Sequence, residues 1–423
     1  MTNTSFSDAS LSLEIRALHT RRKKLSVTQD SEIYSKKQPL LANASVSLPL
    51  IIQTAGVPIH VYTHSLESEA LQQLITLAES GIAEEFVACM PDAHVGVGAT
   101  IGTVFASRSH ISPYAVGSDI GCGMCAVPIQ GLTISNLKKK WKTEIQQSIK
   151  QRIPTGHDSR SKPYPKLGTL GSGNHFIEVL YDETEQIWVM LHSLAGKQMK
   201  KKCLPIKNEL KYLSIESQEG QDYLLDMNWC LNYAKQNRSI MMTILCDIMK
   251  QVTGYSADKS RIVNIHHNYC QTEDVYIESK NTTETLYITR KGATSARKGQ
   301  LGIIPGSMGE GSFIVEGLGD PKSFYSCSHG AGRLLSRTEA MKNISQEDFE
   351  NAMSGITCDV NAALRDECPQ AYKDLTIVMA NQSSLTRVVH RLKPLVNVKG
   401  ISARNIRTRE KKSKKHREFF MTM

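Results

Sequence analysis

Apolar and polar positions alternate along residues 66–80 with the period of an α-helix. An apolar side chain stands at every fourth position, and two further apolar side chains widen the same face. The positions that form this stripe are Leu66, Ala70, Leu71, Leu74, Ile75 and Ala78. The spacing predicts an amphipathic helix, which Ser65 could cap at its start and Gly81 could end.

Short apolar runs separated by Gly, Pro, Asp or Ser dominate the chain after this helix. The runs that we interpret as strands are 86–90, 101–105, 125–129, 176–180, 187–191, 262–266, 284–289, 301–304 and 312–316. Helical patterns occur at 220–253, 330–342, 346–353 and 382–392. Strands and helices interleave without a βαβ period, so the pattern predicts a mixed α+β fold rather than a doubly wound sheet.

The composition is that of a globular protein. The chain has 423 residues, of which 40% are apolar and 22% are charged, which is enough to bury a substantial core. No apolar run approaches the roughly 18 residues that a membrane helix needs, and the N-terminus has no continuous apolar segment typical of a secretory signal. We therefore expect a cytoplasmic protein, with organellar targeting by its first residues as the alternative.

The net charge of +10 is concentrated at the two ends of the chain. Residues 1–40 carry +3 and residues 401–423 carry +6, so residues 41–400 are nearly neutral at +1. We expect a flexible basic arm over residues 1–45, a folded body over 46–400 and a basic tail over 401–423. The two basic segments are predicted to add salt-sensitive affinity for a polyanion or to serve targeting.

Ten cysteines are scattered through the chain, several of them inside apolar runs. In a chain of this length such usage is typical of a reduced intracellular protein rather than of a disulfide framework. The one Cys-x-x-Cys pair, Cys122 and Cys125, has no second pair at zinc-ribbon spacing. Two buried thiols are therefore the plainer interpretation of this pair.

Seven short segments place His, Cys, Asp or Asn beside the predicted strands. They are residues 91–94, 118–123, 171–176, 191–193, 265–268, 305–309 and 328–333. Loops at strand ends are where catalytic groups usually lie, and Asp, thiolate and imidazole are ligands of first-row divalent metals. A single histidine of this kind is more often a hydrogen-bonded structural residue. Their number predicts a metal site, for which the ligand types alone favour zinc.

Three of these segments could also bind a phosphate. Backbone N–H groups could surround an anion in the loops Gly171-Ser-Gly-Asn-His175, Pro305-Gly-Ser-Met-Gly309 and His329-Gly-Ala-Gly-Arg333. The chain contains no Gly-x-x-x-x-Gly-Lys-Ser/Thr motif and no Lys-x-Asp-Gly motif of the ATP-dependent ligases. Any covalent nucleotide must therefore form on another nucleophile.

The order of these segments resembles the RtcB family of GTP-dependent RNA ligases. The resemblance runs from about Gly56 to Gly400, where Val398-Lys-Gly400 matches the usual end of the family. Its longest stretches are Lys291-Gly-Ala-Thr-Ser-Ala-Arg297, Gly302-Ile-Ile-Pro-Gly-Ser-Met-Gly309 and Tyr325-Ser-Cys-Ser-His-Gly-Ala-Gly-Arg-Leu-Leu-Ser-Arg337. It implies central stacked β-sheets surrounded by helices, with residues 46–400 as the catalytic domain.

The resemblance implies ligation of RNA ending in a 3′-phosphate or 2′,3′-cyclic phosphate to RNA beginning with a 5′-hydroxyl. It implies GTP and two Mn²⁺ ions per subunit, which replace the zinc expected from ligand types. A histidine would take GMP and pass it to the RNA 3′-phosphate, and the 5′-hydroxyl would then displace GMP. The RNA could come from transfer-RNA splicing or from RNA repair. The protein could act as a monomer or with an activating protein partner.

The resemblance also implies roles for individual residues. His329 would be the nucleophile that carries GMP. Cys122 would bridge the two metal ions, together with the further ligands Asp119, His175, His192 and His267. The guanylate pocket would be lined by Asn174, Glu178, Asn268, Pro305, Gly306, Ser307, Met308, Ser312, Gly330, Ala331, Gly332 and Lys399. Glu178 could accept hydrogen bonds from the N1–H and amine of guanine, which would select GTP over ATP.

Other interpretations of the same residues stay open. His329 could instead cap a helix that begins near Ala331, His266 is the expected bystander beside His267, and His94 could orient a ligand. The run His192-Ser-Leu-Ala-Gly-Lys197 lacks the arginine that the family usually has there. The alternative functions are therefore an RNA cyclic-phosphate phosphoesterase that cannot seal, or a non-catalytic RNA-binding subunit.

Two stretches of the body are rich in basic residues. Residues 138–166 hold nine basic and two acidic side chains, and residues 197–211 hold six lysines and one acid. They could contact the RNA backbone in a salt-dependent way. The alternative is a solvated helix face that is balanced by the acidic stretch at 213–226.

Overall fold

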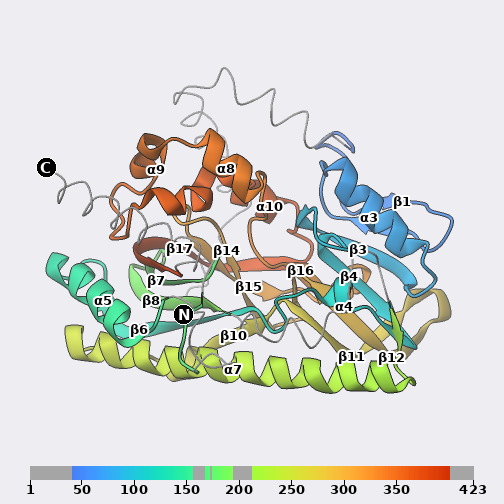
Figure 1. Ribbon diagram of the computed structural model, residues 1–423, viewed down its shortest axis with the longest axis horizontal. Helices are drawn as coiled ribbons and strands as arrows, with labels where there is room; N and C mark the ends of the chain where they lie inside the picture. The colour runs from blue at the N-terminus through green and yellow to red at the C-terminus, as the bar shows by residue number, and fades with distance from the viewer. Residues whose placement is uncertain (1–40, 156–166, 172–173, 194–211, 401–423) are drawn as a thin grey trace, which may run out of the picture.

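The computed structural model describes residues 41–155, 167–171, 174–193 and 212–400. Two large β-sheets form its centre, and helices lie on both sides of them (Figure 1). The long helix α7 (Gln218–Thr253) runs along one side beneath both sheets, and the shorter helices α8 (Arg337–Asn343), α9 (Gln346–Ala352) and α10 (Leu375–Ala380) lie opposite. This arrangement confirms the predicted mixed α+β fold.

The first sheet has six strands in the order β1-β2-β3-β4-β12-β11. Their bounds are β1 (Leu50–Ile52), β2 (Ile59–Val61), β3 (Glu84–His94), β4 (Ile101–Ser107), β12 (Thr282–Lys291) and β11 (Asn268–Ile277). Only β2 and β3 pair in parallel within this sheet. The amphipathic helix α3 (Ser68–Ala78) covers one face of it and buries Ala70, Leu74 and Leu77.

The second sheet has seven antiparallel strands in the order β10-β6-β8-β7-β17-β15-β14. Their bounds are β10 (Val263–His266), β6 (Gly123–Thr133), β8 (Gln186–Ser193), β7 (Phe176–Tyr181), β17 (Thr386–Lys399), β15 (Ser312–Gly317) and β14 (Leu301–Pro305). Two small sheets pair β13 (Ala293–Ser295) with β16 (Ser326–Ser328) and β5 (His110–Ile111) with β9 (Leu213–Ser214). Helix α4 (Pro113–Val116) follows β5.

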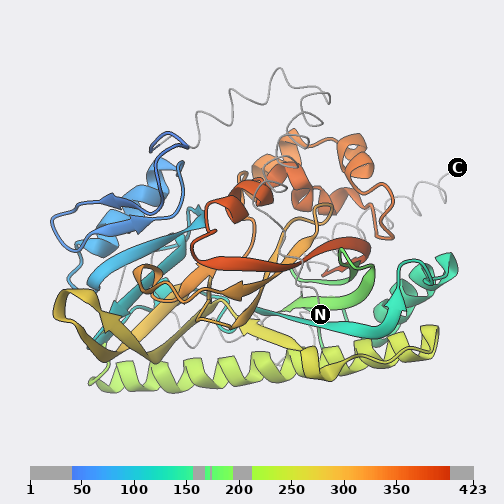
Figure 2. The same cartoon turned by 180° about the vertical axis from the view of Figure 1, so that it is seen from behind.

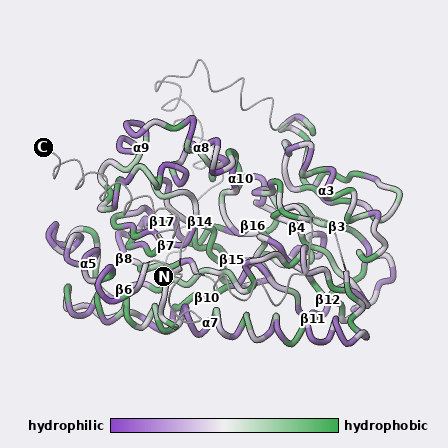
Figure 3. The backbone as a smooth tube through the Cα atoms, in the orientation of Figure 1, coloured by the Kyte–Doolittle hydropathy of each residue, from purple (hydrophilic) through white to green (hydrophobic). Residues whose placement is uncertain are grey.

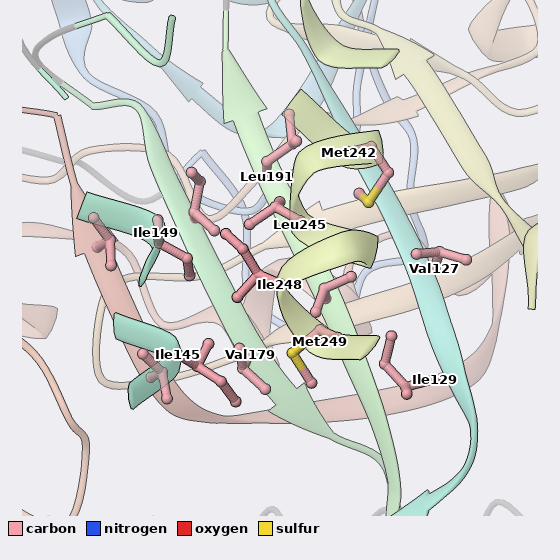
Figure 4. Packing of buried hydrophobic residues seen from close by; sticks show 14 of the residues in the cluster. Val127, Ile129, Ile145, Ile149, Val179, Leu191, Met242, Leu245, Ile248 and Met249 are labelled. Carbon is pink, nitrogen blue, oxygen red and sulfur yellow. The ribbon is translucent and has the colours of Figure 1, made fainter. Parts of the chain in front are cut away.

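One face of the second sheet carries a large apolar core. Helices α5 (Lys139–Arg152) and α7 pack on it, and Figure 4 shows their side chains meeting over β6, β7 and β8. Alternation along the strands explains the pattern, because Ile177 and Val179 of β7 point into this core while Glu178 points to the other face. The opposite face of the same strands is therefore available for polar chemistry.

Helix α7 spans 36 residues, close to the predicted block at 220–253. Ser217 caps its start by accepting from the Gly220 N–H, and Gly254 ends it in the left-handed conformation. Apolar and polar positions alternate along its whole length in Figure 3, and Figure 2 shows from behind that it spans both sheets. The helix thereby holds the two sheets on one common support.

The core under α7 provides a stability prediction. Ile248 is 1% exposed within the cluster, so Ile248→Ala should lower the free energy of unfolding by about 2–5 kcal/mol through lost burial and a residual cavity. The control is Thr243→Ala on the exposed face of the same helix, which should change it by no more than about 0.5 kcal/mol. Urea denaturation measures both, and equal effects would contradict the packing described here.

Eight of the nine apolar runs interpreted as strands lie wholly in strands, and the run 262–266 does so from Val263 onward, but three local predictions need correction. Residues 382–392 were expected to be helical, yet most of them belong to β17, which pairs with β15 and β7. Pairing on both sides outweighs the helical spacing of its apolar residues. The helix α3 begins after Glu67 without a side-chain cap, so Ser65 does not cap it. Gly81 follows its end with a positive φ of 77°.

The prediction of a helix over 330–342 is correct only in its second half. Helix α8 begins at Arg337, where Ser336 and Glu339 form a capping box. The residues before it turn sharply, because Gly332 has a φ of 74° and a side chain there would meet the Asp92 carbonyl oxygen at 2.1 Å. This close approach leaves His329 in a turn after β16, so His329 does not cap a helix near Ala331.

No helix in the described part of the chain is long and apolar enough to span a membrane. The nine described cysteines are all free thiols, as the sequence predicts. The predicted flexible basic N-terminal arm over residues 1–45 lies, apart from its last five residues, outside the described residues, and the whole tail at 401–423 does so too. Residues 194–197, which belong to the run that lacks the family's usual arginine, also lie outside the described residues.

Candidate functional site

At one of the crossings between the two large sheets the connection is a single residue, His267. It lies between the end of β10 in the seven-stranded sheet and the start of β11 in the six-stranded sheet. Its backbone N–H donates to the Cys122 carbonyl oxygen, which fixes the two segments against each other. Cys122 lies immediately before β6 and His192 near the end of β8, and these two strands pair side by side. The fold thus brings three separate segments to one point.

Cys122, His192 and His267 form a buried cluster with the chemistry of a metal site. One ligand atom from each lies within 4.8 Å of the others. The Cys122 Sγ is 3.1 Å from His192 Nε2, which is itself 3.4 Å from His267 Nε2. Thiol and imidazole are ligands for first-row transition metals. The donor set therefore fits a divalent ion, as predicted at the level of a metal site.

The remaining two predicted ligands lie around this cluster. His175 Nε2 is 3.9 Å from Cys122 Sγ, and its ring centroid is 5.4 Å from that of His192. Asp119 accepts the Cys122 N–H on its carbonyl oxygen and lines the same cavity as the cluster. Among the described residues the geometric grouping contains only Cys122, His192 and His267. The structure thus brings His175 close to the shared sulfur and Asp119 to the wall beside it.

The imidazoles of the cluster are held neutral. Burial, reinforced by the neighbouring histidines, lowers the pKa of both His192 and His267 well below the usual range. The His192 Nδ1 lies 3.3 Å from the Asn174 carbonyl oxygen, so it can donate there and leave Nε2 with its lone pair toward Cys122. A neutral imidazole with a free lone pair is the form that binds a metal ion.

His329 sits against a buried carboxylate. Its Nδ1 is 2.6 Å from Asp92 Oδ2, and Asp92 is fully buried at the end of β3. The backbone N–H groups of His329 and Gly330 both donate to the same oxygen. Burial would raise the pKa of Asp92, but the charge and hydrogen bond of His329 outweigh it and hold that pKa below its usual value. Asp92 is therefore held as an ionised carboxylate in close contact with His329 Nδ1.

The ring of His329 also reaches the metal-type cluster. Its centroid is 4.9 Å from that of His267. His94, which could orient a ligand, instead lies beside Asp92, with Nδ1 3.1 Å from the Asp92 carbonyl oxygen. His266 faces away, and its Nδ1 is 2.9 Å from Arg238 Nη2. The structure thus separates His266 from its neighbour His267, as the sequence predicts for a bystander.

A cavity of about 420 Å³ is lined by the three-residue cluster and by His329. Sixteen of the eighteen predicted site residues line it, and His175 and Ser312 do not. Those that line it are Asp119, Cys122, Asn174, Glu178, His192, His267, Asn268, Pro305, Gly306, Ser307, Met308, His329, Gly330, Ala331, Gly332 and Lys399. Ser312 is buried at the start of β15, opposite Pro305 of β14. The predicted site is therefore one connected chamber.

One wall of the cavity consists of facing residues from β7 and β17. Glu178 and Asn397 are directly opposite each other, as are Phe176 and Lys399. Burial raises the pKa of the Glu178 carboxyl to about 7, against the opposing effects of Asn397 and Lys399. The Lys399 Nζ lies 2.7 Å from Glu367, an ion pair in which both side chains are 4% exposed. Glu178, Asn397 and Lys399 of this wall are thus polar side chains that are all buried.

Several residues of the site carry no local sequence signal. Asp92 was part of a noted segment, but its contact with His329 joins positions 237 residues apart. Three basic side chains of the cavity wall were also not among the site residues predicted from the motifs. These side chains are Lys291, Arg333 and Arg337. Arg333 and Arg337 both stand within the long stretch 325–337 that carries the resemblance, so their charge was a usable signal there.

The predicted basic surfaces are described only in part. In helix α5, three basic side chains approach acids, Lys140 to Glu144, Lys150 to Asp359 and Arg152 to Asp247, at 3.8, 2.6 and 3.8 Å. Lys138 lies over the ring of Trp141. Residues 197–211 lie outside the described part of the chain. The role of either surface in binding RNA stays a prediction.

The α+β fold contains a buried thiol–imidazole cluster and, in the same cavity, a histidine in contact with a carboxylate. These features are typical of a metal-dependent enzyme. Comparison with known families adds that a family model described as tRNA-splicing ligase RtcB matches residues 73–164 and 158–400. The chain belongs to the RtcB family. The family predicted from the motifs is thereby confirmed.

Relatives in bacteria and archaea support this membership. The chain is 38% identical over 413 residues to an RNA-splicing ligase RtcB of Escherichia coli, covering 83% of this chain and 99% of that protein. It is 27% identical to a tRNA-splicing ligase RtcB of Methanococcus maripaludis, over 85% of this chain and 98% of that one. For a tRNA-splicing ligase RtcB of Pyrobaculum aerophilum the identity is 28%, over 81% and 95%.

Proposed function

We propose that this protein is an RNA ligase that joins 3′-phosphate or 2′,3′-cyclic phosphate ends to 5′-hydroxyl ends through a guanylylated His329. The observation that carries the proposal is the contact of His329 Nδ1 with buried Asp92 in a cavity shared with the Cys122 cluster. Family membership and the names of the relatives support the RNA ligase class.

Asp92 prepares His329 for attack. An ionised carboxylate at Nδ1 accepts the ring N–H, which leaves the lone pair on Nε2. Nε2 attacks the α-phosphorus of GTP, a nitrogen–phosphorus bond forms, and the bond from that phosphorus to the β-phosphate oxygen breaks. Pyrophosphate leaves. Arg333 and Arg337 on the cavity wall supply positive charge for the triphosphate. The buried Lys291 ammonium already donates to three backbone carbonyl oxygens, and burial lowers its pKa to about 7.

The cluster beside His329 fits divalent metal ions, and the family resemblance favours Mn²⁺. Cys122, His192 and His267 would hold one ion, and His175 with Asp119 would add the ligands of a second around the shared sulfur. Such ions neutralise negative charge on phosphate oxygens during transfer. The neutral imidazoles and the short ligand distances support this use of the cluster.

The transfer then proceeds on RNA. An oxygen of the RNA 3′-phosphate attacks the phosphorus of the bound GMP, and the bond to His329 breaks, which restores the free imidazole. The RNA 5′-hydroxyl next attacks the activated 3′-phosphorus, a phosphodiester forms, and GMP leaves. A cyclic phosphate needs prior hydrolysis of one ester bond to a 3′-phosphate. Asp92 can stabilise the charged imidazole that appears when GMP is attached.

The test uses purified full-length protein, Mn²⁺ and α-labelled GTP, followed by RNA with 3′-phosphate and 5′-hydroxyl ends. We expect an acid-labile label on the protein and then a joined RNA product. A label without joining would favour the change in the run 192–197 as the cause of lost sealing. A parallel reaction uses RNA with a 2′,3′-cyclic phosphate end, and opening of that end without any label on the protein would instead support the phosphoesterase.

A first prediction concerns the carboxylate behind His329. Asp92→Asn should slow guanylylation by about 10²–10⁴-fold, because the amide cannot hold Nδ1–H as a charged acceptor and favours the unreactive tautomer. Quenched-flow labelling with GTP measures the rate, and the melting temperature checks the fold. A variant that folds normally and labels at the wild-type rate would show that Asp92 does not position the nucleophile.

A second prediction concerns pH. The Glu178 carboxyl, with its pKa raised to about 7 by burial, is mostly ionised at pH 8 and mostly protonated at pH 6. Only the ionised form can accept both guanine N–H groups, so the KM for GTP should rise about tenfold per pH unit below 7. In Glu178→Gln the KM should be higher and nearly independent of pH. An identical pH profile in wild type and Glu178→Gln would exclude this carboxyl as the cause.

A further inference from the structure

Asn397 occupies a position in the cavity to which neither the motifs nor the family comparison assigns a role. It lies on β17 directly opposite Glu178 of β7, and both side chains line the cavity. The strand neighbour Val398 points to the other side, where it packs in the core under α7. Antiparallel register therefore places an amide beside the one carboxylate of this wall.

The hydrogen bonds of Asn397 are incomplete. Its Nδ2 donates to Glu178 Oε1 at 2.7 Å, since a carboxylate oxygen can only accept. Its Oδ1 is buried and has no partner among the described residues. Asn397 is 1% exposed and Glu178 is 3% exposed, so bulk water does not serve that oxygen. A buried acceptor of this kind is unfavourable until something donates to it.

We propose that Asn397 is a specificity-determining residue that reads the exocyclic amine of guanine, an inference that rests on the proposed function. Glu178 accepts the N1–H and one amine hydrogen, and Asn397 Oδ1 accepts the second amine hydrogen. The hydrogen bond from Nδ2 also holds the Glu178 carboxylate in the orientation that this pairing needs. Three donors on one guanine edge thus meet acceptors from two facing strands.

The amine contact can be isolated by comparing GTP with ITP, which lacks only that amine. The ratio of kcat/KM for guanylylation with GTP and ITP is measured for wild type, Asn397→Leu and Asn397→Ser. Leucine has no acceptor oxygen and the shorter serine side chain holds its oxygen farther from the guanine amine. In both variants the preference for GTP over ITP should therefore fall about tenfold. Asn397→Asp keeps an acceptor there and should retain more of the preference while weakening both nucleotides.

Equilibrium binding of GMP and IMP by calorimetry gives the same comparison without the covalent step. Val398→Ala is the matched control, because it weakens the packing of the same strand but leaves the cavity side unchanged. It should lower the melting temperature and keep the wild-type GTP preference. A general loosening of β17 would reduce activity with both nucleotides equally, so it cannot imitate a change in the ratio.

The possible results distinguish the role of Asn397 in reading the guanine amine from the proposed covalent mechanism. If wild-type protein binds GMP better than IMP and a folded Asn397→Leu or Asn397→Ser variant keeps that preference, Asn397 does not read the amine. If wild-type protein prefers GMP but never forms a covalent label, the covalent mechanism is wrong and the specificity role can still be judged by binding. Equal wild-type affinity for GMP and IMP would overturn the role of Asn397 directly.

Discussion

Replacing His329 by alanine is expected to abolish the covalent guanylate. The label from α-labelled GTP should fall by at least about 10³-fold, because the variant has no nucleophile in contact with Asp92 and facing the cluster. The melting temperature should stay close to that of wild type, since the His329 side chain is 22% exposed. Denaturing gel electrophoresis after incubation with Mn²⁺ and GTP measures the label.

The control for this experiment is His60→Gln. His60 lies on β2, stacks on Phe86 and does not line the cavity. It should keep the wild-type label, which excludes a general effect of losing a histidine. Persistent labelling of His329→Ala would mean that another residue carries the nucleotide, and peptide mapping of the labelled protein would then identify it.

Replacing Cys122 by alanine is expected to remove metal binding and, with it, guanylylation. The Cys122 sulfur lies 3.1 Å from His192 Nε2 and 3.9 Å from His175 Nε2, so its loss affects both sides of the cluster. Bound Mn²⁺ after gel filtration should drop from about two ions per chain to none. Metal content is measured by atomic emission, and labelling with GTP is measured on the same samples.

Cys125 provides a matched control three residues away. It is fully buried in the apolar core under α7, where burial raises the pKa of its thiol to about 12. Cys125→Ala should lose some stability but keep the metal content and the label. If Cys122→Ala folded and retained wild-type Mn²⁺, the shared-sulfur arrangement would be wrong. If both variants lost metal equally, the effect would be one of folding.

Much of the fold could be predicted because alternation and glycine-rich turns mark its strands. The prediction failed at 382–392, where Val388, Val389 and Leu392 follow a helical spacing although the segment forms most of β17. The sheet partners that decide this conformation are remote in sequence, so the local pattern could not reveal them. The helix α5 was considered only as the alternative for the basic stretch 138–166, because its many charged residues weakened the apolar stripe.

The residues of the candidate site also fall into two groups, those that the sequence could predict and those that only the structure reveals. Residues within long motifs, such as His329 and Cys122, could be found from the resemblance. Asp92 and Asn397 act through contacts across 237 and 219 residues of chain, which depend on a turn and on a strand register. No spacing rule encodes such pairs. Their discovery required the three-dimensional arrangement, whereas the chemistry of each pair follows directly once it is seen.

The single-residue connection at His267 limits how far the strands on either side of it can move relative to each other, and it determines the effect of cutting the chain there. At this crossing one residue connects β10 of the seven-stranded sheet to β11 of the six-stranded sheet, so no flexible linker there can absorb a displacement between these two strands. Slippage by one strand position, about 3.3 Å, would exceed by far the roughly 0.2 Å tolerance of a metal–ligand distance. The two strands on either side of His267 must therefore keep their relative position whenever the cluster holds an ion. A cut at this joint would leave neither half with a complete coordination sphere.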